Sequence, residues 1–334
     1  MATGFHGIYP ILYAFFDAQG RLDRGAMRAQ VEACVRHGAH GLAVLGLATE
    51  TYKLQTPERR QVLEWAAEDL RGRIPLAVTI AEPSVAGQVE FARAAKSVGA
   101  SWVILQPPPA PGLPEIEYVR FFGAVADKCE LPLAVQNAAG LIAVSLSNAG
   151  LVALNRNHPN VSLLKGEGPV IGIQRLVEET RGVFDIFNGR AGLELTDNLR
   201  AGCAGMIPAP ECFDVQVRIY ELMRQGTPEA EAEAERLYRE ILPLITLLMT
   251  TIENFLCYGK RIVARRLGIA EVPASKRGVR TLLAFYGSTP SYRPVLDVEG
   301  WGDLQPELNA LSKQGDWGGM ADRHLDYSNI PTVV

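Results

Sequence analysis

The sequence lacks the features that mark several large classes of protein. Its five cysteines are scattered, odd in number and without a CxxC pair, which disfavours a disulfide framework and a zinc site. Lys and Arg (33 residues) do not outnumber Asp and Glu (37 residues), and the formal net charge is -4. No basic stripe is available to hold a phosphate backbone, so we expect no nucleic-acid partner.

Two nucleotide-binding signatures are also missing. No Walker A motif occurs, and the stretch Gly38-Ala-His-Gly41 lacks the order GxGxxG. An open, doubly wound sheet that binds a dinucleotide would be expected to begin with that fingerprint. The sequence therefore gives no sign of a nucleotide cofactor.

Long apolar runs are absent as well. The longest, Ile241–Met249, contains Pro243 and is shorter than the roughly 20 apolar residues that cross a bilayer, so we expect no membrane association. The N-terminal residues Met1 to His6 show no basic region followed by an apolar run, which predicts no signal peptide. Together with the unpaired cysteines, this predicts a cytoplasmic protein.

What the sequence does contain is a regular alternation of strands and helices. Short apolar or β-branched runs are separated by helix-length segments, at about 20 to 35 residues per unit, which predicts a parallel sheet with helical crossovers. Eight such units favour a closed (β/α)8 TIM barrel over an open sheet, because the number matches closure. The predicted strands are Gly7–Phe16, Gly41–Gly46, Ile74–Ile80, Trp102–Pro107, Leu131–Asn137, Val161–Glu167, Phe184–Gly189 and Ala204–Ala209.

The strand pattern ends near residue 210, and this divides the chain. We expect a catalytic barrel over residues 1–210 and a C-terminal helical extension over 211–286, interrupted at Gly226-Thr-Pro228. Residues 287–334 are rich in Gly, Pro, Asp and Asn and predict an irregular tail. Its tryptophans indicate that the tail docks on a surface.

The most informative stretch is Val161-Ser-Leu-Leu-Lys165-Gly-Glu167, a predicted buried strand that carries a lysine and a glutamate two residues apart. Side chains at i and i+2 of a strand point to the same face, so Lys165 and Glu167 should project into one site. A lysine in a dry barrel mouth can be neutral and form an imine with a ketone. For an arbitrary strand, a solvated ion pair would be the plainer interpretation.

Other polar residues fall at the same ends of the predicted strands, where the chemistry of this barrel type takes place. They come from five different strands, and this convergence on one rim favours the catalytic interpretation of Lys165. These residues are Thr49-Glu50-Thr51, Gln106, Gln136-Asn137, Lys165, Glu167 and Asn188-Gly189-Arg190.

The order of these motifs resembles the dihydrodipicolinate synthase/N-acetylneuraminate lyase superfamily of class I aldolases, over about the first 290 residues. The resemblance implies that Lys165 forms a Schiff base with a 2-keto acid. It also implies that the loop after strand two, usually Gly-Thr-Thr-Gly-Glu, holds the substrate carboxylate. Here that loop reads Gly46-Leu47-Ala48-Thr49-Glu50, so Thr49, Thr51 and the backbone N–H of Ala48 are the predicted substitutes.

Two departures from the family pattern narrow the expected reaction. The tyrosine of strand five is Gln136 here, and a carboxamide cannot take a proton from a substrate hydroxyl, which weakens a retro-aldol route. The arginine of dihydrodipicolinate synthases falls near Leu141, so a second substrate carboxylate has no partner there. Gln136 together with Glu167 resembles the 2-keto-3-deoxy-L-arabonate dehydratase branch.

This branch implies a role for each candidate residue. Lys165 would form the imine, Glu167 would act as the base, Gln136 would orient the substrate, and Asn188 would hold a substrate hydroxyl or a relay water. Asn137 and Gly189 are further predicted substrate contacts. No metal or organic cofactor is expected, since the imine itself accepts the electrons.

Three alternatives remain open from the sequence. The chain could be a pyruvate-releasing class I aldolase on a 2-keto acid, a dihydrodipicolinate synthase-like protein, or a non-catalytic binding protein for keto acids. The resemblance also implies a homo-oligomer, a dimer or a tetramer. The stereochemistry of the sugar acid is not specified by the sequence.

Overall fold

The computed structural model describes residues 3–17, 19–138, 144–269, 288, 290, 293, 297 and 302–316. The chain divides into two compact units. The first comprises Met1–Phe15 and Leu22–Val272, and the second comprises Phe16–Arg21 and Pro273–Val334. The barrel and the helices that directly follow it all lie in the first unit.

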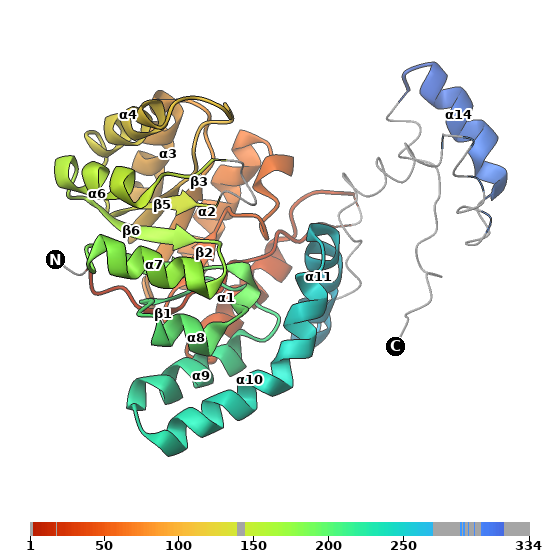
Figure 1. Ribbon diagram of the computed structural model, residues 1–334. Coiled ribbons are helices and arrows are strands. Elements are labelled where there is room, and N and C mark those ends of the chain that lie inside the picture. The colour runs from red at the N-terminus through yellow and green to blue at the C-terminus, as the bar shows by residue number, and fades with distance from the viewer. Residues whose placement is uncertain are drawn as a thin grey trace. The chain divides into compact units, whose positions relative to one another are not determined.

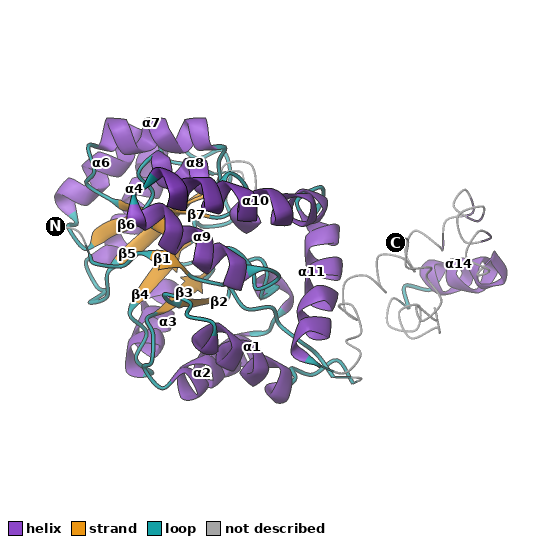
Figure 2. Ribbon diagram, turned by 90° about the horizontal axis from the view of Figure 1, so that it is seen from below, coloured by secondary structure: helices purple, strands orange, loops and turns teal. Residues whose placement is uncertain are grey.

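Eight parallel strands form a single sheet in the order β1-β8-β7-β6-β5-β4-β3-β2. A bridge between Ile11 and Ala43 joins the chain just after β1 to β2 and closes the ring. In Figure 2 the strands form the centre and helices surround them. This confirms the predicted (β/α)8 barrel, and each strand lies inside its predicted segment. The strands are β1 (Gly7–Ile8), β2 (Leu42–Val44), β3 (Leu76–Ile80), β4 (Trp102–Leu105), β5 (Leu133–Asn137), β6 (Val161–Gly166), β7 (Asp185–Asn188) and β8 (Gly205–Met206).

The strands are almost continuously apolar because both of their faces are covered, one by helices and the other by the barrel interior. Several of the helices begin at side chains that cap them. Asp23 accepts from the N–H of Ala26, and Ser84 from that of Gly87. The barrel helices are α1 (Arg24–Arg36), α2 (Thr56–Leu70), α3 (Val85–Ser97), α4 (Glu115–Ala126), α6 (Asn148–Asn157), α7 (Val170–Thr180) and α8 (Leu195–Arg200), with 3-10 turns η1 (Thr51–Lys53) and η2 (Arg190–Gly192).

Aromatic side chains pack against one another inside the barrel. Tyr9 meets Trp102 and Phe187 edge to face, with ring centroids 5.6 Å and 5.1 Å away. Space for them depends on small neighbours, since a Cβ on Gly41 would collide with the Tyr9 ring. The interior is thus filled by side chains, as is usual for a barrel of this type.

The predicted helical extension is confirmed through residue 267. It consists of α9 (Phe213–Gln225), α10 (Pro228–Leu248) and α11 (Ile252–Leu267). Gly226 ends α9 in a left-handed conformation and Pro228 occupies the first turn of α10, as expected for a break at this point. Figure 1 shows α11 on the side toward which the β5 and β6 arrows point. Residues 270–286 lie outside the described part of the chain.

α11 is attached to the barrel by a buried polar contact. The Tyr13 hydroxyl donates to the Glu211 carboxylate and also lies 3.0 Å from the carbonyl oxygen of Phe255 on α11. A Cβ on Gly259 would collide with both the Tyr13 hydroxyl and the Glu211 carboxylate, so a glycine is required for this approach. Burial raises the pKa of the Glu211 carboxyl to about 7.

The second unit contains a helix where an irregular tail was predicted. α14 (Gln305–Lys313) follows the 3-10 turn η4 (Gly302–Leu304), with Pro306 in its first turn. Leu308 is fully buried against Leu304 and Leu311, which repeat at helical spacing. The polar composition of the tail concealed this short apolar stripe. Trp301 and Trp317, on which the prediction of a docking tail rested, lie outside the described residues.

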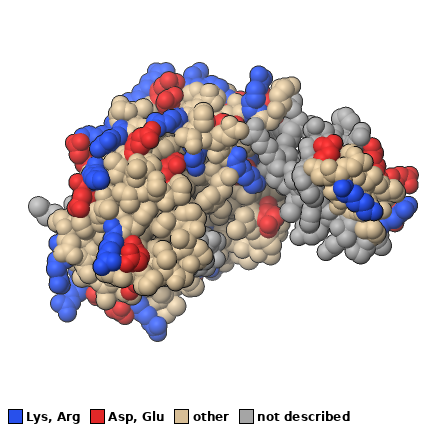
Figure 3. Space-filling view, turned by 90° about the horizontal axis from the view of Figure 1, so that it is seen from above, with Lys and Arg blue, Asp and Glu red and all other residues tan. Residues whose placement is uncertain are grey.

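None of the helices in the described ranges is long and apolar enough to cross a membrane. On the face in Figure 3, positive and negative side chains are interspersed.

The raised pKa of Glu211 predicts a pH-dependent stability. The folded protein keeps this proton up to about pH 7, whereas the unfolded chain releases it near the ordinary value of 4.5, so stability should fall as the pH rises between these values. The fall should amount to at most about 3 kcal/mol. Thermal unfolding of the wild type and of Glu211→Gln between pH 4.5 and 7.5 should give a flatter profile for the variant. Parallel profiles would contradict the assignment.

Candidate active site

Lys165 and Glu167 lie together at the carboxyl end of β6. Lys165 is the penultimate residue of the strand and Glu167 follows its last residue. The Lys165 Nζ contacts Glu167 Oε1, and the two side chains are only 5% and 7% exposed. The prediction that the two side chains project into one site is confirmed. They form a buried pair rather than a solvated one.

The pair lines a cavity of about 230 Å³. Its walls come from the chain after strands β1, β2, β6, β7 and β8, which is the carboxyl end of the barrel. The turn between α10 and α11, residues 249–252, and Phe255 also line it. Among the described residues that line it, only Lys165, Glu167 and Arg190 carry charged side chains. The arrangement is an apolar pocket with a few convergent polar groups.

Glu167 is held from the side opposite Lys165. Its Oε2 accepts from the backbone N–H of Arg190 at 3.1 Å, so both carboxylate oxygens have donors. Gly189 makes this possible, because a Cβ there would collide with the carboxylate. Arg190, Ala191 and Glu194 all adopt left-handed backbone conformations, with φ of 55°, 54° and 58°. Such conformations are unfavourable for non-glycine residues and concentrate at functional sites.

Gln136 lies beside Lys165 on the neighbouring strand, since the two residues are partners in the register of β5 and β6. Its Oε1 accepts from Gln106 Nε2 at 2.9 Å, and Gln106 Oε1 in turn accepts from the Tyr52 hydroxyl at 2.5 Å. The Gln136 Nε2 group makes no hydrogen bond with any described residue. It is therefore available to donate to a bound molecule.

The loop after β2 differs in part from the prediction. The Thr49 hydroxyl donates to the Leu12 carbonyl at 2.7 Å and accepts from the Leu45 N–H at 2.9 Å. The Thr51 hydroxyl donates to the Leu45 carbonyl at 2.5 Å. Both side chains are buried and neither lines the cavity, and their hydroxyls brace the loop through these hydrogen bonds.

Ala48 does line the cavity. Within the described ranges, the backbone N–H groups of Ala48 and Thr49 have no hydrogen-bond partner. Two free, neighbouring donors of this kind suit a carboxylate. The backbone of this loop, rather than its hydroxyls, is the available anion-binding element.

Asn188 and Asn137 also depart from their predicted roles. Asn188 is fully buried, and both of its N–H donors are used, toward the Gly168 carbonyl at 3.0 Å and Asn198 Oδ1 at 2.9 Å. Asn137 exchanges two hydrogen bonds with the backbone of Leu146. Neither residue lines the cavity. They position the loops after β7 and β5, because their amides are satisfied inside the protein.

The structure adds two elements without a predicted role. Arg190 faces the cavity, and its Nη1 donates to Glu194 Oε2 at 2.7 Å, while Nε and Nη2 make no hydrogen bond with any described residue. Its place at the end of strand seven was the only sequence signal. The α10–α11 turn, residues 249–252, gave no signal, because its residues are typical of any helix connection.

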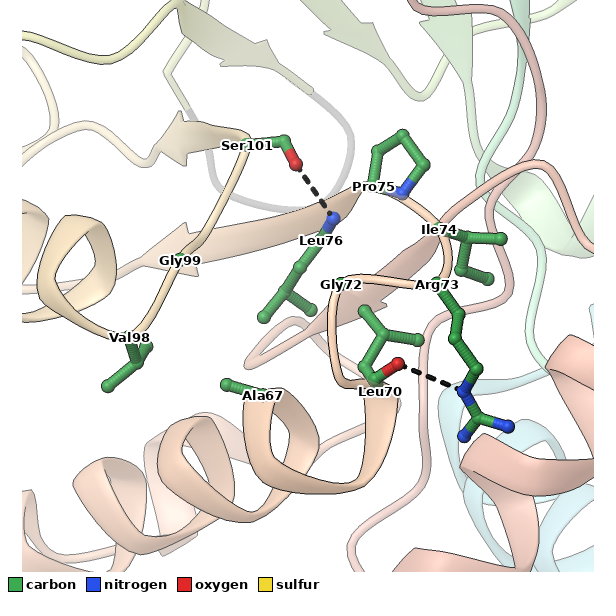
Figure 4. A pocket seen from close by; sticks show the side chains of 10 residues that line it. All are labelled: Ala67, Leu70, Gly72, Arg73, Ile74, Pro75, Leu76, Val98, Gly99 and Ser101. Atoms are coloured by element: carbon green, nitrogen blue, oxygen red, sulfur yellow. Dashed lines mark hydrogen bonds between the residues drawn. The ribbon is translucent and has the colours of Figure 1, made fainter.

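A second cavity, of about 330 Å³, lies at the other end of the barrel (Figure 4). It is bordered by the end of α2 and the starts of β3 and β4. Its one charged residue, Arg73, donates from Nε to the Leu70 carbonyl at 3.0 Å and from its terminal nitrogens to Glu32. Ser101 Oγ accepts from the Leu76 N–H at 3.2 Å. With these groups satisfied, the cavity offers no chemistry comparable to that of Lys165.

No group of three or more His, Cys, Asp or Glu side chains is arranged to hold a metal ion in the part of the chain that the structure describes.

Two of the proteins to which this chain is similar in sequence carry different names. The 4-hydroxy-tetrahydrodipicolinate synthase of Methanoculleus marisnigri is 29% identical over 247 residues, which cover 72% of this chain and 83% of that protein. The L-2-keto-3-deoxyarabonate dehydratase of Azospirillum brasilense is 28% identical over 248 residues, which cover 72% of this chain and 78% of that protein. The two relatives carry different activities at nearly equal identity, so identity alone does not choose between them.

The fold is shared with solved structures. The crystal structure of YagE, a prophage protein from Escherichia coli in complex with pyruvate, superposes with a TM-score of 0.72 at 22% identity and covers 78% of this chain and 88% of that one. The model of the dihydrodipicolinate synthetase family matches residues 4–275. Since this match extends over the barrel and the helices α9 to α11, the chain belongs to the dihydrodipicolinate synthetase family and is a lyase of that family.

Proposed function

We propose that this protein is a Schiff-base-forming dehydratase that acts on a 2-keto-3-deoxy sugar acid, with 2-keto-3-deoxy-L-arabonate as substrate and 2-oxoglutarate semialdehyde as product. The observation that carries the proposal is the buried contact between Lys165 and Glu167 in the cavity. Gln136 does not itself line the cavity, but it lies beside Lys165 on the neighbouring strand. A nucleophile, a base and an amide donor are adjacent, and no tyrosine occupies the strand-five position. The similarity to an arabonate dehydratase supports the same choice.

The reaction begins at the lysine. Glu167, in contact with the Lys165 Nζ, takes a proton from the Lys165 ammonium group, and the amine then adds to C2 of the keto acid. Two of the three nitrogen protons pass through Glu167 to the C2 oxygen, which leaves as water, so that a protonated imine forms and Glu167 is again a carboxylate. The imine nitrogen then withdraws electrons from C3 and makes its protons acidic.

Elimination follows on the same face. Glu167 removes a proton from C3, the electron pair forms the C3–C4 double bond, and the C4 hydroxyl leaves as water after it receives the proton from Glu167. Tautomerisation through C5 and hydrolysis of the imine release the semialdehyde and free Lys165. One water is lost overall and no electrons are exchanged, so the reaction needs neither metal nor organic cofactor.

The remaining contacts orient the substrate. The N–H groups of Ala48 and Thr49 bind the C1 carboxylate, and the Gln136 Nε2 group donates to a substrate oxygen near C2 or C4. Arg190, with its unused Nε and Nη2 donors, holds the hydroxyls at the far end. The dimer or tetramer implied by the family stays a prediction.

The proposal predicts a covalent adduct at Lys165. Borohydride reduction in the presence of 2-keto-3-deoxy-L-arabonate should add the mass of the reduced acid to the peptide that carries Lys165. Lys165→Ala should abolish both the adduct and turnover, because Lys165 is the only lysine among the described residues that line the cavity. Lys96→Ala, which replaces an exposed lysine, is the control and should behave as the wild type. Full turnover of Lys165→Ala would end the proposal.

Product analysis separates dehydration from carbon-carbon cleavage. A dehydratase yields a semialdehyde and no pyruvate, whereas an aldolase yields pyruvate that lactate dehydrogenase reduces. We expect semialdehyde alone from the 2-keto-3-deoxypentonate. Pyruvate as the main product would establish the aldolase alternative, and binding without either product would establish a non-catalytic protein.

Replacement of Glu167 by glutamine tests the base. Glu167→Gln keeps the size of the side chain but cannot accept the C3 proton, so turnover should fall about 10²- to 10⁴-fold. Imine trapping should persist at saturating substrate. An unchanged rate would assign the base to another group.

Replacement of Arg190 tests the recognition of the far end. In Arg190→Ala, loss of hydrogen bonds from a charged donor should raise the KM for 2-keto-3-deoxy-L-arabonate about 10-fold or more. The concentration of pyruvate needed for half-maximal trapping should not change, because pyruvate has no distal hydroxyl. If 2-keto-3-deoxy-L-arabonate and pyruvate lose affinity by the same factor, Arg190 contacts the substrate carboxylate instead.

A further inference from the structure

A second buried ion pair lies outside the proposed reaction. Lys260 on α11 contacts Glu50 Oε1 in the loop after β2, and the two side chains are 1% and 0% exposed. Glu50 Oε2 also contacts Lys53 at 2.6 Å. Burial alone lowers the pKa of the Lys260 amine, whereas contact with the carboxylate favours the charged form. Neither Lys260 nor Glu50 lines the cavity, so neither takes part in the chemistry.

Glu50 terminates the loop that carries the free N–H groups. Its own N–H donates to the Leu47 carbonyl at 2.9 Å, and its backbone has a left-handed φ of 54°. This conformation is unfavourable for a glutamate unless other contacts maintain it. The contacts at the side chain are those to Lys260 and Lys53. The position of Ala48 therefore depends on Glu50, which in turn is held by Lys260 of α11.

α11 is a firm support for this contact. Its Phe255 lines the cavity, and its Gly259 lies against Tyr13 and Glu211 with no room for a Cβ. Lys260 follows Gly259 directly, so its backbone position is determined by that packing. The same helix thus supplies a cavity wall and the cation that holds the loop of Ala48.

We propose that Lys260 is a positioning residue: through Glu50 it holds the loop 46–50 in the conformation in which the N–H groups of Ala48 and Thr49 bind the carboxylate of a 2-keto acid. The inference rests on the proposed function only in requiring a carboxylate-bearing ketone that forms an imine with Lys165. It makes the helical extension part of substrate binding in addition to its role as a wall of the cavity.

Loss of the cation should weaken carboxylate binding and leave the chemical step almost unchanged. An interaction of equal strength in the ground state and the transition state affects KM and not kcat. We expect Lys260→Met to raise the KM for 2-keto-3-deoxy-L-arabonate about 10-fold, with kcat within about 3-fold of the wild type. Measurements should be made well below the melting temperature of every variant.

Two ketones make the test specific for the carboxylate. Pyruvate and hydroxyacetone can both be trapped at Lys165 with borohydride, but only pyruvate has a carboxylate. In Lys260→Met the concentration for half-maximal trapping should rise about 10-fold for pyruvate and stay the same for hydroxyacetone. An equal change for the two ketones, or no change for either, would overturn the proposal.

A double variant separates positioning from stability. Lys260→Met alone leaves a buried carboxylate with only the partly exposed Lys53, and should lower Tm. Adding Glu50→Gln removes the uncompensated charge and should restore much of the Tm, while pyruvate trapping stays weak because the loop has lost its anchor. If trapping recovers together with Tm, the pair is merely structural. If Lys260→Met does not fold, the trapping of pyruvate and of hydroxyacetone should be compared in Glu50→Gln alone.

Asp69→Asn provides a matched control. Asp69 is a buried carboxylate of α2 that contacts Arg24 and Arg28, with a side chain 4% exposed, and it does not line the cavity. This variant should lower Tm without a change in pyruvate trapping. A wild type that traps neither ketone would contradict the proposed function, whereas a wild type that traps both and a Lys260→Met protein that equals it would contradict the positioning role alone.

Discussion

A lysine and a carboxylate buried together are unfavourable unless each charge is compensated and the remaining hydrogen-bonding groups are satisfied. The site of this protein meets that condition at Glu167, whose two oxygens face Lys165 and the backbone N–H of Arg190. Gly189 leaves the necessary space, and the left-handed turn that follows brings the N–H into place. The loop after β7 therefore has its unusual backbone because it must support a buried carboxylate.

The barrel by itself would not complete the cavity. Residues 249–252 and Phe255 of the helical extension line it, and the buried Lys260 of α11 meets the loop that carries Ala48. α11 is also attached to the barrel through Tyr13 and Glu211. A change in the helical extension should therefore alter substrate binding. The boundary near residue 210 thus separates two patterns of secondary structure but does not separate two functions.

The proposed substrate, a small anionic ketone with polar distal groups, is compatible with the residues that line the cavity. Among the described residues, its charged lining side chains are Lys165, Glu167 and Arg190, and the first two form a pair. Arg190 is consequently the cation that remains for the rest of the substrate, although Glu194 balances part of its charge. Such an environment suits hydroxyls better than a second carboxylate, which agrees with the lack of an arginine in the loop after β5.

The sequence by itself determined the barrel, its eight strands and the proximity of Lys165 to Glu167, because strand alternation and i, i+2 geometry are local properties of the chain. It did not determine which polar side chains face the cavity. Thr49, Thr51, Asn137 and Asn188 are of the expected types at the expected strand ends, yet their hydrogen bonds are satisfied by backbone and side chains that only folding brings near. Tertiary structure likewise decided the roles of Arg190, Phe255 and Lys260. Glu50 and Lys260, for example, are 210 positions apart in the chain, so no local sequence pattern predicts their contact.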